Sequence, residues 1–237
     1  MFEGAFAAVS KEIVDAFIEE TELLKAGMID EDKPHYNEKA LTLFLLLRFW
    51  ANSSFEIHTN EDELCELLFM KPRDKNKKDI MMNLRKMEED TYLHIRQNPN
   101  NKFFLIELNY EYFMPENNFT IIYKKEFDEL LPEKTSDRLV ILLYCIKKYQ
   151  YKKTGISFPS IETIVKDTGQ SRSAVCRNLA KMDKVLNTYK AIINFDNDTF
   201  KEITYYKSVC DGEISKGLIE NIAKVQFKNI KSITKKE

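Results

Sequence analysis

The stretch SIETIVKDTGQSRSAVCRNLAKM, residues 160–182, consists of two short amphipathic segments joined by a turn. Ser160 and Ser171 precede the two segments, where a serine side chain accepts a backbone N–H of the first helical turn. Gly169 lies between the segments, where the turn of a helix pair often requires glycine. One face of the second segment is apolar at helical spacing, through Val175, Leu179 and Met182. The stretch therefore predicts two short helices that pack together.

The flanking residues predict one more helix and three strands. An alternating pattern covers Tyr189–Ile193 and Phe200–Tyr205 around the polar turn Asp196–Asp198, as in a β-hairpin. Upstream lie an apolar helical stretch, Leu139–Tyr149, and a short strand with a polar cap, Ile156–Ser160. The expected order is therefore helix, short strand, two helices and a hairpin.

The same order occurs earlier in the chain. Residues Ile80–Met87 align with Val175–Met182, and four of the eight positions are identical. The other matching segments of the first copy are Leu41–Trp50, Glu56–Asn60, Glu61–Leu68, Tyr92–Arg96, the turn Asn98–Asn101, and Phe103–Leu108. Even the lead-ins Val9–Ile13 and Tyr123–Phe127 match. We therefore expect one duplication, with a Pro/Asn linker near Met114–Asn118.

A helix pair followed by a hairpin is the arrangement of a winged helix. The pattern Gly-x-Ser-Arg-Ser-x-Val-x-Arg-x-Leu, residues 169–179, resembles bacterial winged helix-turn-helix domains. The duplicated arrangement, over about residues 5–209, resembles tandem winged-helix replication initiators and replisome organisers of plasmids and phages. The resemblance implies a mainly α fold with small β content (α+β), built of two tandem winged helix-turn-helix domains plus a C-terminal helix. It also implies replication proteins as partners.

We expect a first winged-helix domain over residues 1–113, a second over 114–209, and a C-terminal amphipathic helix with a basic tail over 210–237. Residues 1–113 carry 14 basic and 22 acidic side chains, whereas residues 114–237 carry 22 and 16. A polyanion should prefer the basic half. The second domain is therefore the expected main DNA-binding unit.

A helical wheel predicts which side chains of the second copy face DNA. Opposite the apolar stripe lie Ser173, Arg177, Ala180 and Lys184, flanked by Arg172 and Lys181. Arg177 is the best candidate for reading bases, because a guanidinium pairs bidentately with guanine. The helix start at Ser160 offers backbone amides to phosphate, and Ser171 is a further DNA-binding candidate. Along the wing, the candidates for further contacts with double-stranded DNA are Lys190, Asn197 and Lys201.

The first copy gives a different face, with Lys78, Met82, Arg85 and Glu89 opposite the apolar stripe. The accessory DNA-binding candidates are Arg73, Lys75, Lys77, Lys78 and Arg85. Two interpretations remain open. This basic run touches the DNA backbone, or the domain binds a protein through an exposed Met82. The acidic balance of residues 1–113 favours the second.

The tail has a helical apolar stripe through Ile214, Leu218, Ile222 and Val225. The stripe predicts a helix docked on the second domain, or alternatively a dimerisation helix. A homodimer through this helix or through the first domain is therefore an open expectation. The basic end, Lys231–Lys236, is typical of a disordered tail.

Several classes of protein are disfavoured. The six glycines form no dinucleotide fingerprint or P-loop, and the four cysteines form no C-x-x-C pair. His35, His58 and His94 have no metal-ligand spacing, so we expect no metal, no cofactor and no enzymatic activity. No apolar stretch is long enough to span a membrane, and the first residues lack the features of a signal peptide, which predicts a cytoplasmic protein.

The expected function is sequence-specific binding of double-stranded DNA. By resemblance, the role is replication initiation for a plasmid or phage. The alternatives are a transcriptional regulator of a mobile element, which would use the same contacts, and a protein–protein adaptor whose winged helices bind no DNA.

Overall fold

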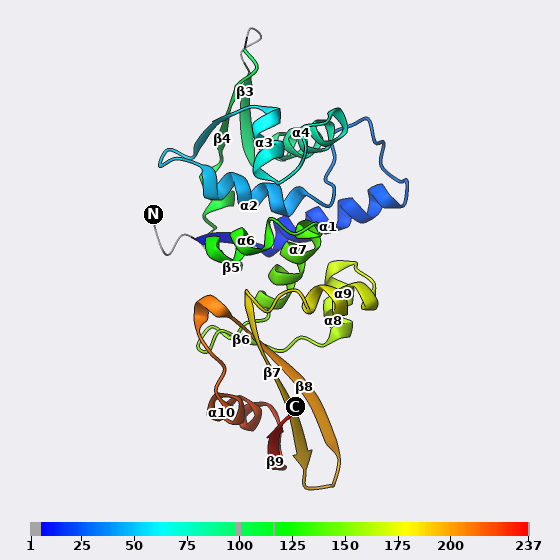
Figure 1. The fold of residues 1–237 in the computed structure, drawn as a ribbon, viewed down its shortest axis with the longest axis vertical. Coiled ribbons are helices and arrows are strands. Elements are labelled where there is room, and N and C mark those ends of the chain that lie inside the picture. Colours follow the sequence, from blue (N-terminus) through cyan, green and yellow to red (C-terminus); the bar gives the residue numbers. More distant parts are fainter. Residues whose placement is uncertain (1–5, 98–100, 116, 237) are drawn as a thin grey trace. The chain divides into compact units, whose positions relative to one another are not determined.

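The computed structural model describes residues 6–97, 101–115 and 117–236. Its packing divides the chain into unit 1, Met1–Ile141, and unit 2, Leu142–Glu237, and the division falls inside helix α7, Ser136–Lys147. Each unit combines α-helices with small antiparallel sheets (Figure 1). The expected α+β class is therefore confirmed.

Unit 1 contains the element order that its half of the sequence predicts, preceded and followed by further elements. In chain order these are β1 (Phe6–Ser10), α1 (Lys11–Lys25), α2 (Ala40–Trp50), β2 (Glu56–Thr59), α3 (Glu61–Leu67), α4 (Asp74–Glu89), β3 (Leu93–Gln97), β4 (Phe104–Leu108), α5 (Tyr110–Phe113), β5 (Phe119–Tyr123), α6 (Lys124–Leu130) and the first part of α7. Strands β2, β4 and β3 form one antiparallel sheet in that order. The expected hairpin turn at Asn98–Asn101 lies outside the described residues except for Asn101.

The two strands that run into the matching lead-in segments pair with each other. Strands β1 and β5 form an antiparallel sheet in which Val9 is opposite Thr120. Each strand runs directly into a helix, and the Ser10 side chain caps α1 by accepting the N–H of Ile13 at 3.3 Å. This pairing ties residues 119–123 to the start of the chain. The expected boundary after residue 113 therefore lies within unit 1.

Helix α2 forms the core of unit 1, because it is apolar on nearly every side. Its buried side chains include Leu41, Leu43, Phe44, Leu45 and Leu47. The ring of Phe44 stacks on that of Phe113 at a centroid distance of 4.0 Å.

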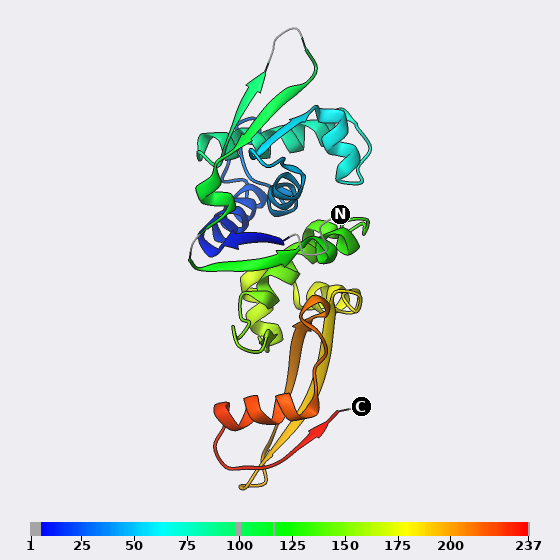
Figure 2. The ribbon, with the colours of Figure 1, turned by 90° about the vertical axis from the view of Figure 1, so that its left-hand side faces the viewer.

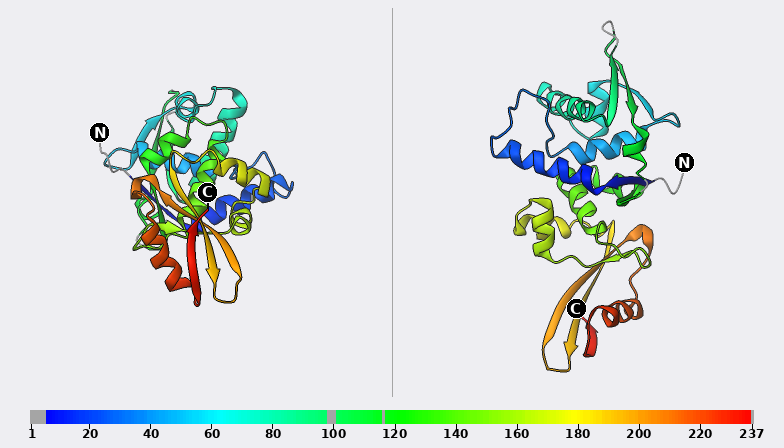
Figure 3. Two further views of the ribbon diagram at one scale, coloured as in Figure 1. Left: turned by 60° about the horizontal axis from the view of Figure 1, so that its bottom comes forward. Right: turned by 180° about the vertical axis from the view of Figure 1, so that it is seen from behind.

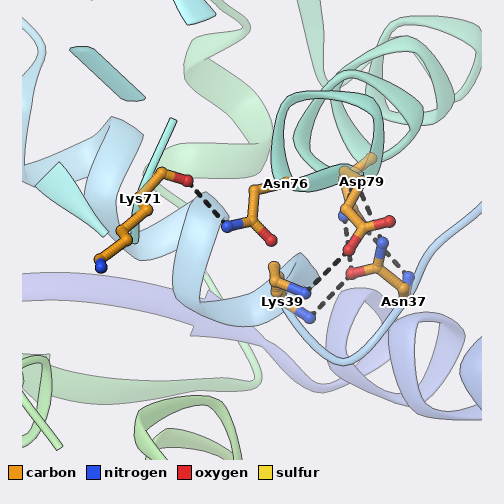
Figure 4. A network of polar contacts seen from close by, with 6 residues as sticks. Asn37, Lys39, Lys71, Asn76 and Asp79 are labelled. Carbon is orange, nitrogen blue, oxygen red and sulfur yellow. Dashed lines mark hydrogen bonds and ion pairs between the residues drawn. The ribbon is translucent and has the colours of Figure 1, made fainter. Parts of the chain in front are cut away.

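A partly buried polar network fixes α4 against the segment that precedes α2 (Figure 4). The Asn37 N–H donates to Asn83 Oδ1 at 3.0 Å, and Asn83 Nδ2 donates back to Asn37 Oδ1 at 2.8 Å. Asn83 Nδ2 also donates to the carbonyl of Asp79 at 2.8 Å, and the Asp79 carboxylate pairs with Lys39 at 3.2 Å. Because Asn83 is fully buried, these bonds satisfy polar atoms that water does not reach.

Unit 2 also contains its expected element order. After the end of α7 it has β6 (Ile156–Ser157), α8 (Ile161–Thr168), α9 (Arg172–Leu179), β7 (Leu186–Phe195), β8 (Phe200–Ser208), a 3₁₀ turn (Val209–Asp211), α10 (Lys216–Gln226) and β9 (Ile230–Lys235). The four strands form one antiparallel sheet in the order β6-β8-β7-β9, and β7 and β8 make a long ribbon (Figure 2).

The ribbon has two chemically different faces, because successive side chains of a strand point to opposite sides. The inner face carries Tyr189, Ala191 and Tyr205, which form the core of unit 2 together with Ile156 of β6 and Ile219 of α10. The opposite side, here called the outer face, is mostly polar.

The C-terminal residues fold onto this sheet. Helix α10 buries Ile219 and Ala223, with Ile214, Leu218 and Ile222 packed beside them. The predicted docking of this helix on the second copy is thus observed. Val225 is 87% exposed, however, so the prediction that it belongs to the docked apolar stripe was wrong.

The basic end is not a disordered tail, because it forms strand β9 beside β7 (Figure 3). In this pairing Ile233 is opposite Ile193 and packs on the core of unit 2, which gives the strand an apolar anchor. No helix among the described residues is both long and apolar enough to cross a membrane.

Candidate nucleic-acid interface

Local side-chain caps define the helix pair α8–α9. Ser160 Oγ accepts the N–H of Thr163 at 3.1 Å, and Ser171 Oγ accepts the N–H of Ala174 at 3.3 Å. Between the helices Gly169 has a φ of +64°, a left-handed conformation that disfavours residues with a Cβ. The three positions therefore do what the sequence predicts for them.

One side of α9 is anchored in unit 2. Val175 and Met182 are buried and Leu179 is half-buried, as the spacing predicts. Asn178 is also buried, and its Nδ2 donates to Gln170 Oε1 in the turn at 2.9 Å. This asparagine corresponds to Asn83 in the first copy, so both copies bury the same polar side chain. The anchoring leaves the opposite side of α9 facing solvent.

All ten candidate side chains of unit 2 are exposed: Ser160, Ser171, Arg172, Ser173, Arg177, Lys181, Lys184, Lys190, Asn197 and Lys201. Ser173 and Arg177 lie on α9 itself. The helix ends at Leu179, however, so Lys181 and Lys184 lie in the turn that follows it and not on its far face. The helical wheel placed them on α9 because it assumed a longer helix.

Arg177 differs from Arg172 in what surrounds it. Among the described residues Arg177 makes no hydrogen bond or ion pair, so its guanidinium is available to a ligand. Arg172 forms an ion pair with Glu162 of α8. The hydrogen bond from Arg172 holds the pKa of the Glu162 carboxyl below its ordinary value, so Glu162 is charged at neutral pH.

The register of the hairpin separates two of the predicted wing contacts. Lys190 is opposite Thr204 and lies on the outer face, whereas Lys201 is opposite Ile193 and lies on the inner face. The Lys201 ammonium lies 5.1 Å from the centroid of the Phe227 ring, a cation–π distance. Lys190 and Lys201 therefore extend from opposite sides of the ribbon, and Asn197 lies in the turn between the strands.

A groove of about 540 Å³ lies beside the helix pair and the ribbon. Its charged lining residues are Glu162, Arg172, Lys190, Lys201, Glu202 and Lys236, and Ser160 and Tyr206 also line it. Tyr206 is a buried ring whose pKa is raised to about 12 by that burial, so it supports the sheet and offers no exposed stacking surface.

Sequence reasoning missed Glu162, Glu202 and Lys236 as residues of this groove. The Glu162–Arg172 pair was foreseeable, since both residues stand in the first turns of adjacent helices. Lys236 was not, because Ile230 and Ile233 of β9 do not follow the two-residue period of a strand.

The first copy presents its cations differently. Lys75, Lys77, Lys78 and Arg85 lie within α4 and Arg73 precedes it. Lys77 pairs with Asp62 at 2.5 Å and Lys78 pairs with Asp32 at 2.8 Å, which raises the pKa of both lysines. Two of the five accessory candidates are thus already neutralised by carboxylates.

Met82 was expected to be exposed, and that prediction was wrong, since it is only 8% exposed. Helix α4 packs against α3 on one side and bonds to the segment around Asn37 on another, so more than one stripe of it is covered. A protein contact centred on Met82 is therefore not available in this conformation.

Charge separates more strongly by structural unit than by sequence half. Unit 1 contains 18 basic and 28 acidic side chains, and unit 2 contains 18 and 10.

The described residues contain no group of His, Cys, Asp and Glu side chains placed to hold a metal ion. No protein family matches the sequence, and no curated protein matches it either.

Proposed function

We propose that this protein binds double-stranded DNA sequence-specifically, with α9 of unit 2 as the element that reads the bases. The observation that carries the proposal is the exposed side of α9, where Ser173 and Arg177 face solvent while Val175 is fully buried. A helix held by one side and presenting a guanidinium on the other suits the major groove, which is about 12 Å wide.

The charge of unit 2 supports this assignment. An excess of eight basic over acidic side chains attracts a polyanion and accelerates its encounter with the protein. Lys184 after α9 and Lys190 on the ribbon are exposed as well and add to the positive charge of unit 2. Such side chains position DNA through its phosphates, while Arg177 contributes discrimination between bases.

The proposal includes two tandem winged helix-turn-helix domains. Its support is the repeated element order, α2-β2-α3-α4-β3-β4 and α7-β6-α8-α9-β7-β8. A further parallel lies just after the first helix of each pair. Phe69, the second residue after α3, has a φ of +54°, and Gly169, the first residue after α8, has a φ of +64°. Both copies thus make the turn through a left-handed residue, although only the second has the glycine.

By resemblance, the role of DNA binding is replication initiation for a plasmid or phage, and regulation of transcription is the alternative. Selection of bound duplexes from a random pool tests sequence specificity. A shared sequence enriched in the bound fraction supports the proposal, and a bound fraction that stays random contradicts it. A site that recurs as iterated repeats beside the gene favours replication.

Unit 1 has a second candidate function, as a protein-binding module. The observation in its favour is its acidic charge, together with the pairing of Lys77 and Lys78 to Asp62 and Asp32. Replacing Arg73 and Lys75 with alanine should leave DNA affinity unchanged if unit 1 binds protein. A large loss of DNA affinity would assign these residues to the DNA backbone.

A further inference from the structure

The groove of unit 2 has an unusual arrangement of charge. Four cations and two carboxylates line it, and each carboxylate bonds to one of the cations. Glu162 pairs with Arg172, and Glu202 pairs with Lys236 at 2.6 Å. Lys190 has no carboxylate partner among the described residues and lies beside Lys236, whose backbone N–H donates to the Lys190 carbonyl at 2.8 Å.

Three of these residues share the outer face of the sheet. Lys190 lies on β7 and Glu202 on β8, and their side chains point to the same side of the sheet. Lys236 follows β9 at the position opposite Lys190. Strand β9 therefore converts the ribbon into a three-stranded surface that carries more positive charge than a two-stranded wing would.

The two ion pairs are exchangeable. Their side chains are between 42% and 69% exposed, and ion pairs in water contribute only about 0–1 kcal/mol to stability. Other contacts already hold the surrounding fold. Serine caps hold α8 and α9, and backbone hydrogen bonds hold the strands. Neither carboxylate is therefore needed for folding.

We propose that this groove is a second contact site for the DNA backbone, in which a phosphate replaces Glu162 on Arg172 and Glu202 on Lys236. The inference rests on the proposed function, and it adds a site on the sheet to the one on α9. The chemistry is conservative, since a phosphate oxygen takes the place of a carboxylate oxygen on the same donors.

The exchange has a measurable consequence for salt dependence. A phosphate neutralised by a protein cation releases a condensed cation into solution, which gives a slope of about −0.9 in log K against log salt. Each displaced glutamate, however, remains beside the DNA as a negative charge that the protein did not expose before binding. Its repulsion of the phosphates offsets the gain from the cation, so Arg172 and Lys236 add little salt dependence to the wild-type protein.

The test compares the full-length protein with its Glu162→Gln and Glu202→Gln variants, using fluorescence anisotropy of a labelled random-sequence duplex over a range of KCl concentrations. Each variant should bind more tightly, by about eightfold at 0.1 M salt, and its slope should steepen by about 0.9. Lys190→Gln should bind more weakly, with a slope shallower by about the same amount.

Glu220→Gln is the matched control, because it makes the same change of net charge on α10, where Glu220 pairs with Lys216 outside the groove. Its slope should stay that of the wild type. Thermal unfolding of every variant verifies that the fold is intact.

Wild-type slopes in both glutamine variants, or weaker binding by them, overturn the groove site. A steepened slope in Glu220→Gln overturns it as well, because the effect would then come from net charge. If the wild-type protein itself binds no DNA, the proposed function fails together with the groove site. A steep wild-type slope with unresponsive glutamine variants removes the groove site alone.

Discussion

Arg177→Ala measures what one side chain of α9 contributes to sequence recognition. In the described structure this guanidinium has no intramolecular partner and lies on an exposed side of the helix. Truncation therefore breaks no hydrogen bond or ion pair among the described residues, and thermal stability should be unchanged. All of the lost binding energy then belongs to the contact with DNA.

A bidentate arginine–guanine contact is worth about 1–3 kcal/mol of discrimination, which is a factor of about 5 to 150 in affinity. The variant should lose this factor on the DNA selected from a random pool and much less on random duplex. Anisotropy titrations at one salt concentration measure both. Arg172→Ala is the comparison, because a phosphate contact weakens binding to both duplexes equally. Equal losses for Arg177→Ala on the two duplexes would refute its role in reading bases.

Three further predictions concern stability and pH. Ile219→Ala should destabilise unit 2 by about 2–5 kcal/mol, because this residue is fully buried between α10 and the sheet; an unchanged thermal unfolding curve would contradict the docking of α10. Asn83→Ala leaves the N–H of Asn37 without its acceptor and should lower the free energy of unfolding by about 1–3 kcal/mol, as measured by chemical denaturation. Asn76→Ala removes only an exposed hydrogen bond to Lys71, so it should lower the free energy of unfolding by less in the same assay. DNA affinity should be constant between about pH 6 and 8, because unit 2 contains no histidine. The lowered pKa of Glu162 also keeps its carboxyl ionised until the pH falls below the ordinary value of 4.5. A tenfold change of affinity between about pH 6 and 8 would contradict this prediction.

The candidate site was largely predictable because its determinants are local. Caps at Ser160 and Ser171 and the glycine between them depend on a few neighbouring residues, and the spacing of Val175 and Met182 fixes which side of α9 is buried. The exposure of Arg177 follows from that rotation alone.

The features that sequence did not reveal depend on distant segments. Met82 is buried because α3 and the segment around Asn37 both cover α4, and neither contact appears in a single-helix wheel. The pairing of β1 with β5 joins residues more than a hundred positions apart.

Alternation along the two strands of the hairpin was visible in the sequence, but the faces on which Lys190 and Lys201 lie were not. Which strand residues share a face depends on the register, and the turn at residues 196–198 sets that register. Strand β9 forms only because β7 offers it an edge, so its own short and irregular pattern carried too little signal.

The central claim is that unit 2 is a DNA-binding surface. The most direct measurement is the salt dependence of the wild-type protein's affinity for a double-stranded duplex. Several phosphate contacts predict a straight line in log K against log salt, with a slope of about −0.9 for each contact and a total steeper than about −3. A slope near zero, or no binding at low salt, would contradict the claim.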